Sequence, residues 1–157
     1  MICKVNIRRK AQKQLVKISA NDYKKVKLRL AYPNFEQQYR KMIFNVLARN
    51  HDDHVKNFSF LMGEDGTWKI SPAYDLCFSY SPGGLWTREH HSSINGKFDH
   101  FTREDLLGFA RTFGIKKASR IIEEVKDAVS SWPAIAAELD IPRVRISQIQ
   151  KLLRLDI

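Results

Sequence analysis

Apolar residues recur every three to four positions in several stretches of the chain, which is the spacing of one face of an α-helix. The clearest stretch follows Asn34, a residue type that favours the start of a helix. Its apolar face comprises Phe35, Tyr39, Met42, Ile43, Val46 and Leu47. The pattern predicts a buried helix whose last turn contains Arg49 and Asn50.

Further helices are predicted in the second half of the chain. Thr102 and Asp105 have the spacing of an N-terminal capping box, and Gly114 suits the position after the end of that helix. The next apolar stripe stops before Pro133, because proline disfavours a helical conformation in the residue that precedes it. The last helix is expected to begin with Pro142 at its first position. Its inward residues are Ile146, Ile149, Leu152 and Leu153.

A short β-hairpin is predicted after the first of these helices. Residues 58–62 and 67–70 favour strands, and residues 63–66 between them have the composition of a turn. Residues 94–97 predict another tight turn. The expected fold class is therefore α+β and mainly α-helical.

Residues 1–33 are expected to form a basic N-terminal appendage to a domain at 34–157. Residues 2–7 alternate as a short strand does, and Arg8 to Lys17 predict a helix. Of the 27 basic and 17 acidic residues, ten and one lie in residues 1–30, which leaves a balanced remainder. The appendage is thus either a solvated basic helix or a contact for nucleic acid. The net charge of +10 says little about the rest of the chain.

The 157-residue chain has a hydrophobic content of 43%, which suits one hydrophobic core of a soluble domain. No apolar run approaches the roughly 20 residues of a membrane span, and no signal peptide pattern is present. Cys3 and Cys77 form neither a metal-binding nor a disulfide pattern. These features predict a cytoplasmic protein.

The most informative stretch is the polar loop that precedes the hairpin. Asp52 and Asn57 have the D-x-x-x-x-N spacing of a kinase catalytic loop, in which the acid orients a hydroxyl and the amide binds Mg²⁺. The hairpin doubles the chain back, so that Asp75 is expected near Asn57, where both can ligate one Mg²⁺. Lys56 is a candidate phosphate contact, or it neutralises the nearby carboxylates.

Other interpretations of this loop stay open from the residues alone. Asp52 and Asn57 also suit a turn for local reasons, and Asp53 is an alternative base at a spacing one residue shorter. Imidazoles and carboxylates suit a transition-metal hydrolase as well. The residues for such a site are His51, Asp52, Asp53, His54, His90, His91 and His100. The last three histidines are otherwise expected to face solvent.

The chain resembles the C-terminal lobe of HipA-family kinases, the Ser/Thr kinase toxins of bacterial toxin-antitoxin systems. The resemblance covers about residue 35 to the C-terminus and depends on landmarks in consecutive order. These are residues 44–50 (FNVLARN), 52–59 (DDHVKNFS), 71–76 (SPAYDL), 93–97 (SINGK) and 101–107 (FTREDLL). Residues 10–17 (KAQKQLVK) are similar to the start of RelE-like ribonuclease toxins, and nothing downstream continues that family.

The resemblance implies a protein-kinase-like C-lobe with a hairpin after the catalytic loop, and it implies roles for its residues. Asp52 corresponds to the catalytic aspartate, and Asn57 and Asp75 correspond to the ligands of Mg²⁺. Lys56 and His54 are added as candidate contacts of the ATP phosphates. The sequence Asp75-Leu76-Cys77 replaces the D-F-G motif of other kinases. The implied reaction is ATP-dependent phosphorylation of a protein Ser/Thr, typically in an aminoacyl-tRNA synthetase.

The Gly-rich loop and strand lysine that cover ATP in a kinase are missing from the sequence. The chain is therefore expected to lack its own N-lobe and to be a poor kinase unless a separate chain supplies that lobe. The resemblance also implies a HipB-like helix-turn-helix antitoxin as partner and operator DNA as a possible contact. Lys116, Lys117 and Arg120 are the candidate DNA-binding residues, although a solvated helix face fits them too. The alternative function is a non-catalytic remnant that binds a partner protein or DNA.

Overall fold

The computed structural model describes Lys4–Val5 and residues 35–157. In this part of the chain, helix α3 (Phe35–Leu47) precedes a hairpin of strands β2 (Phe60–Met62) and β3 (Trp68–Ile70). The helices that follow are α4 (Arg103–Thr112), α5 (Ala118–Ser130), α6 (Trp132–Glu138) and α7 (Arg143–Gln150). This mixture of several helices with a small antiparallel sheet confirms the α+β class.

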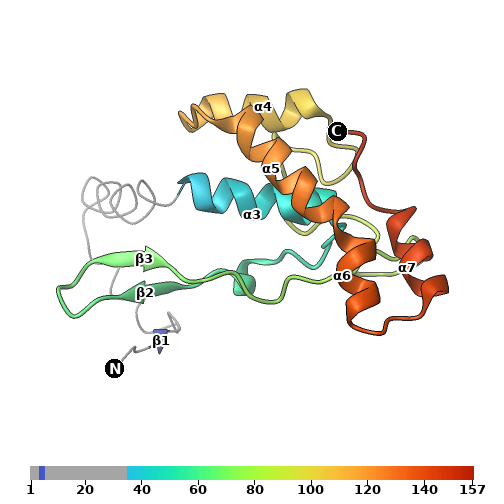
Figure 1. Cartoon of the computed structure of the whole chain (residues 1–157). Coiled ribbons are helices and arrows are strands. Elements are labelled where there is room, and N and C mark those ends of the chain that lie inside the picture. The colour runs from blue at the N-terminus through green and yellow to red at the C-terminus, as the bar shows by residue number, and fades with distance from the viewer. Residues whose placement is uncertain (1–3, 6–34) are drawn as a thin grey trace.

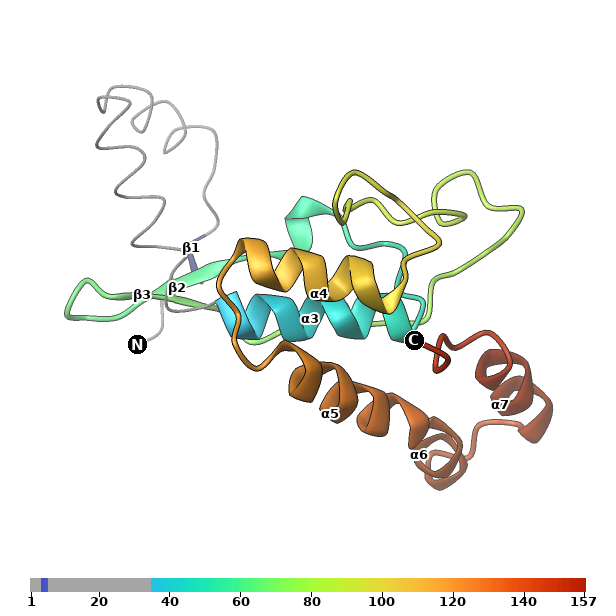
Figure 2. The same cartoon turned by 90° about the horizontal axis from the view of Figure 1, so that it is seen from above.

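Helix α3 lies at the centre of the domain. Helices α4 and α5 lie on one side of it and the β2–β3 hairpin on the other (Figure 1). Helices α6 and α7 form the end of the domain that is farthest from the tip of the hairpin (Figure 2). None of the described helices has the length and apolarity that crossing a membrane requires. The described helices are thus layered around α3.

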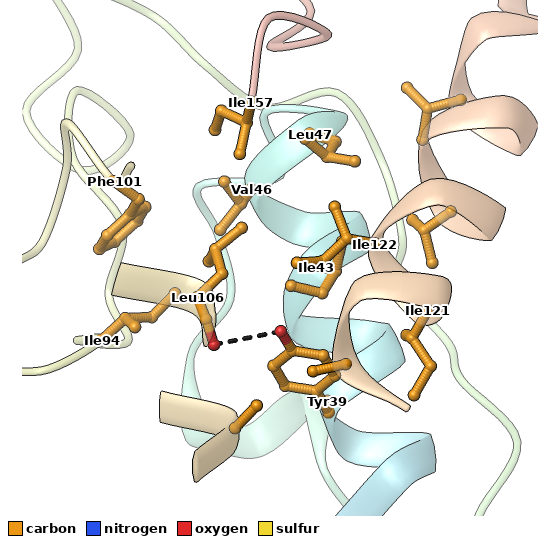
Figure 3. Packing of buried hydrophobic residues seen from close by; sticks show 14 of the residues in the cluster. Tyr39, Ile43, Val46, Leu47, Ile94, Phe101, Leu106, Ile121, Ile122 and Ile157 are labelled. Carbon is orange, nitrogen blue, oxygen red and sulfur yellow. Dashed lines mark hydrogen bonds between the residues drawn. The ribbon is translucent and has the colours of Figure 1, made fainter. Parts of the chain in front are cut away.

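The hydrophobic core forms where α3 meets α4 and α5. Tyr39 and Ile43 of α3 are completely buried, as are Leu106 of α4 and Ile122 of α5. The hydroxyl of Tyr39 donates a hydrogen bond of 3.1 Å to the main-chain oxygen of Leu106 (Figure 3). Burial raises the pKa of Tyr39 to about 12, which keeps the hydroxyl available as a donor. The core therefore holds α3 against both α4 and α5.

The sheet contains one more strand than the hairpin. Strand β1 (Lys4–Val5) pairs antiparallel with β2, with Val5 opposite Phe60, and β2 pairs antiparallel with β3. The predicted strand in residues 2–7 is thus confirmed at these two positions. The helix predicted from Arg8 to Lys17 lies outside the described residues, as does the RelE-like segment.

Several predicted boundaries are confirmed by the local geometry. The Thr102 side chain accepts from the main chain of Asp105, whose carboxylate binds back to Thr102, as a capping box requires. Gly114 follows α4 with a φ of 68°, in the left-handed region that favours glycine after a helix. Residues 94–97 form a tight turn in which Ile94 and Lys97 are bridged. The sequence could predict each of these features because each one depends on residues that are close together along the chain.

Other boundaries differ from the prediction. Helix α3 ends at Leu47, and Arg49 turns the chain away with a φ of 57° instead of forming the last helical turn. Pro133 does not merely end α5, because it lies in the first turn of a separate helix, α6, that the pattern missed. Pro142 caps α7 and does not begin it, and Leu152 is 39% exposed, since it lies beyond the end of α7.

The buried face of α5 is expected to carry much of the stability. Replacing Ile122 by alanine removes a fully buried side chain and should lower the free energy of unfolding by about 3 kcal/mol. The same change at Ile135, which is 50% exposed on α6, should cost less than about 1 kcal/mol. Urea unfolding of both variants measures the difference, and equal losses would contradict this assignment of the core.

Candidate functional site

The polar loop starts from a buried carboxamide at the end of α3. Asn50, three residues after the end of α3, is almost completely buried, and its Nδ2 donates to Oδ1 of Asn45 of α3 at 3.0 Å. The same nitrogen lies 3.4 Å from the main-chain oxygen of Asp75, and Oδ1 accepts from the Ser79 hydroxyl at 3.3 Å. Asn50 therefore connects the helix to the segment that follows the hairpin. Sequence analysis had placed it only in a last helical turn.

Asp52 keeps its carboxylate accessible while its main chain is held. The main-chain nitrogen donates to Ser79 Oγ at 3.0 Å, and the main-chain oxygen accepts from Asn57 Nδ2 at 2.9 Å. The side chain is 43% exposed, with His54 Nε2 at 3.6 Å and His91 Nε2 at 4.0 Å from Oδ1. A carboxylate in this position is free to accept a proton or a hydrogen bond from a ligand.

Asp53 is oriented the opposite way. Its Oδ1 accepts from the main-chain nitrogens of His91 at 2.7 Å and Ser92 at 3.0 Å, and Oδ2 lies 3.0 Å from Nδ1 of His90. The residue is 6% exposed. Both carboxylate oxygens are therefore used to hold residues 90–92 against the loop, which disfavours Asp53 as the alternative base.

Asn57 and Asp75 are brought to the same region by the end of the hairpin. Asn57 ends a 3-10 turn (Val55–Asn57) and is 5% exposed. The hydroxyl of Tyr74, the neighbour of Asp75, donates to the main-chain oxygen of Lys56 at 2.8 Å. Partial burial raises the pKa of the Cys77 thiol, and the carboxylates of Asp75 and Asp52 raise it further. The Tyr74 hydroxyl and the main-chain oxygen of Asp75, which lies 3.4 Å from Asn50 Nδ2, thus attach this segment to the loop.

The oxygen atoms of these residues suit a hard cation. Asn57 uses Nδ2 to bind the loop, and its Oδ1 has no donor among the described residues. Asp75 is exposed with a φ of 54°, which Asp tolerates, and its carboxylate forms no salt bridge in the described part of the chain. One amide oxygen and one carboxylate fit Mg²⁺, which takes few protein ligands and keeps water or phosphate in its other positions.

Lys41 of α3 was not singled out by the sequence, where it reads as an ordinary polar position on a helix. Its Nζ donates to the main-chain oxygen of Asn57 and lies 4.3 Å from the ring centre of Phe58. Burial lowers the pKa of Lys41, while the carboxylates of Asp75 and Asp53 raise it. An ammonium group therefore lies beside the loop and within the field of Asp75. Only its position beside Asn57 distinguishes it from other lysines.

A family model described as the HipA-like C-terminal domain matches residues 4–132. This range covers most of the chain. The chain belongs to the HipA-like C-terminal domain family. The match begins at residue 4, whereas the landmarks that suggest the family in the sequence begin near residue 35.

The curated relatives of this HipA-like protein include a longer protein of Haemophilus influenzae that is named "Putative kinase". The two are 24% identical over 135 residues, which cover 74% of this chain and 39% of that protein. The chain thus spans well under half of the relative's length. No solved structure matches the chain.

The remaining candidate residues of the HipA-like domain lie at the surface or at its edge. Lys56 is exposed beside the loop, and His54 is half-buried next to Asp52. Lys116 and Lys117 are exposed before α5, at a distance along the chain from the loop. Arg120 pairs with Glu124 at 2.7 Å, which neutralises part of the predicted DNA-binding patch. Of these residues, the structure places His54 next to the Asp52 carboxylate.

The histidines do not form the transition-metal site that the sequence left open. No group of three His, Cys, Asp or Glu side chains among the described residues is arranged to hold a metal. His90, expected at the surface, is 4% exposed because Asp53 binds it, and its ring stacks on buried His51 at 4.0 Å. His51 and His90 thus pack beneath the loop, while His91 reaches Asp52.

Asp53 and its neighbour should differ sharply in their effect on stability. Asp53→Asn removes a carboxylate with three partners and should lower the free energy of unfolding by about 2 kcal/mol. Asp52→Asn changes a half-exposed side chain and should alter it by less than about 0.5 kcal/mol. Urea unfolding at pH 7.5 compares the two. A larger loss for Asp52→Asn would reverse the assignment.

His51 should make the protein sensitive to acid. Burial above all, with His90 and Arg49 nearby, lowers its pKa to about 4, whereas an unfolded histidine has a pKa of about 6.5. The stability that neutral His51 contributes is complete above pH 6.5 and is lost as the pH falls toward 4, because the unfolded chain binds the proton first.

The expected loss through His51 between pH 7.5 and pH 5 is about 2 kcal/mol. Urea unfolding at both pH values measures it, with His51→Phe as the variant that keeps an aromatic ring and cannot be protonated. This variant should lose correspondingly less stability on acidification. The same pH dependence in both proteins would show that His51 is not the group responsible.

Proposed function

We propose that the chain is the Mg²⁺-binding half of a Ser/Thr protein kinase, with the architecture of a kinase C-lobe. The observation that carries the proposal is the convergence of Asp52, Asn57 and Asp75 on one region. Asn57 Nδ2 donates to the main-chain oxygen of Asp52, and the Tyr74 hydroxyl donates to that of Lys56. Asn50 Nδ2 lies 3.4 Å from the main-chain oxygen of Asp75. These residue types are the ones that phosphoryl transfer requires.

Each residue has a role that follows from its surroundings. The accessible carboxylate of Asp52 orients the acceptor hydroxyl and takes its proton, since no strong ion pair occupies it. Asn57 and Asp75 hold Mg²⁺, which would neutralise the charge of the phosphates. Lys56, which is exposed beside the loop, and His54, 3.6 Å from Asp52 Oδ1, would contact the phosphates. These roles are those of a site that accelerates the reaction mainly by positioning the reactants and by electrostatic stabilisation.

The partners and the setting are part of the same proposal. The ATP-covering lobe would lie outside these 157 residues, because they contain no Gly-rich phosphate loop. Family membership and the name of the Haemophilus relative support kinase chemistry. The proposed substrate is of the HipA type, a protein such as an aminoacyl-tRNA synthetase in the cytoplasm. A HipB-like antitoxin would bind the chain and bring it to operator DNA, where Lys116, Lys117 and Arg120 are the contacts.

One observation favours the second candidate, a module that binds a partner without catalysis. Apolar side chains of α6 and α7 and the turns beside them are exposed, namely Ile135 (50%), Leu139 (68%), Val144 (71%) and Leu152 (39%). Exposed apolar side chains in a group are typical of an interaction surface. This surface lies at the opposite end of the domain from the hairpin tip (Figure 2). It is compatible with a kinase as well.

The metal site can be tested on the chain itself. Mg²⁺ with ATP should raise the melting temperature of the wild type by a few degrees, roughly 3–5 °C at a ligand concentration ten times the dissociation constant. Asp75→Asn should abolish this shift, because the variant lacks the carboxylate. Asp140→Asn is the matched control, since Asp140 also has a positive φ, 56°, and is exposed. Differential scanning fluorimetry measures all three proteins.

Asp52→Asn separates metal binding from catalysis. It should keep the shift of the wild type and lower the rate of phosphate transfer at least about 100-fold when a chain that supplies the covering lobe is present. No shift in the wild type, or the same shift in Asp75→Asn, would rule out the metal site and leave the binding module as the function.

A further inference from the structure

Lys41 contacts several residues of the candidate site. Its side chain leaves the core helix α3, and its Nζ donates to the main-chain oxygen of Asn57. The ammonium group lies 4.3 Å from the ring centre of Phe58 and 5.3 Å from that of Tyr74. A half-buried lysine with one carbonyl partner and two aromatic faces is held in a single position.

These contacts reach both segments that carry the metal ligands. Asn57 is itself one ligand, and Tyr74 immediately precedes the other, Asp75. The Tyr74 hydroxyl also binds the oxygen of Lys56, so that the two segments and the lysine form a closed set of contacts. Helix α3 is fixed by the core, since Tyr39 and Ile43 are completely buried on the same helix. Lys41 thus attaches the segments at Asn57 and Tyr74 to a rigid helix.

We propose that Lys41 is a positioning residue that sets the relative placement of Asn57 and Asp75 for the divalent cation. The proposal rests on the proposed function, because it assumes that these two residues bind the metal. A cavity of about 30 Å³, with room for about one water molecule, lies beside Lys41, Asn57 and Ser71. Lys41 reaches the Asn57 carbonyl at the edge of this cavity.

The sign of the effect distinguishes positioning from charge. If Lys41 acted only through its positive charge, its removal would strengthen the binding of a cation beside Asp75. If it positions the ligands, its removal should weaken binding, as the loss of groups that orient metal ligands does. We expect the dissociation constant for Mn²⁺, a paramagnetic substitute for Mg²⁺, to rise about tenfold in Lys41→Met.

The experiment titrates the full chain with Mn²⁺ and follows the free ion by electron paramagnetic resonance. Lys126→Met is the control outside the site, because Lys126 is also half-buried on a core helix, α5, and its Nζ donates to an oxygen of the last residue, Ile157, at 3.1 Å. Both methionine variants should melt at lower temperature than the wild type. Only Lys41→Met should bind Mn²⁺ more weakly. Lys41→Arg, which keeps the charge and the donors, should restore most of the affinity.

The outcomes separate the two proposals. Mn²⁺ binding by the wild type that is lost in Asp75→Asn but unchanged or tighter in Lys41→Met would overturn the role of Lys41 and leave the metal site intact. No Mn²⁺ binding by the wild type would overturn the metal site and the role of Lys41 with it. If Lys41→Met does not fold, Lys41→Gln replaces it, because glutamine is too short for the carbonyl of Asn57 yet stays polar, and it should show the same weakening.

Discussion

The buried carboxamide of Asn50 is the contact on which the geometry of the site depends. It is 1% exposed and binds α3 through Asn45, while its other contacts reach the main chain of Asp75 and the hydroxyl of Ser79. Buried amide groups must be hydrogen-bonded, so the segments that meet Asn50 are held to one arrangement. The Ser79 hydroxyl in turn accepts a hydrogen bond from the main-chain nitrogen of Asp52. Asn50, just after the end of α3, thereby holds both the Asp75 segment and, through Ser79, the main chain of Asp52.

Two adjacent aspartates in this arrangement serve different purposes. Asp53 uses both oxygens to hold residues 90–92, a segment that returns from far along the chain. Asp52 leaves its carboxylate half exposed between two imidazoles. A buried carboxylate with main-chain donors is a structural anchor, and an accessible one beside a candidate metal site is available for chemistry. Asp52 can stay accessible because Asp53 makes the hydrogen bonds that hold the loop to residues 90–92.

The hydrophobic core and the site share one element, helix α3. Its apolar face packs against α4 and α5, and Lys41 on the same helix extends to the loop at Asn57. A site held by a rigid helix keeps its geometry better than one built from loops alone. Lys41 therefore connects the core helix to Asn57, as Asn50 connects it to the Asp75 segment.

The sequence by itself determined the features that depend on neighbouring residues. It predicted α3, the hairpin, the capping box at Thr102 and the glycine after α4, because periodicity, caps and turns are local. Its spacing and landmarks also indicated the family, which the match to residues 4–132 confirms. The tertiary structure alone decided which of Asp52 and Asp53 is accessible, why His90 is buried, and that Asn50 and Lys41 hold the loop. These depend on contacts between segments 16 to 39 residues apart, and no local pattern encodes which distant partner a polar side chain will meet.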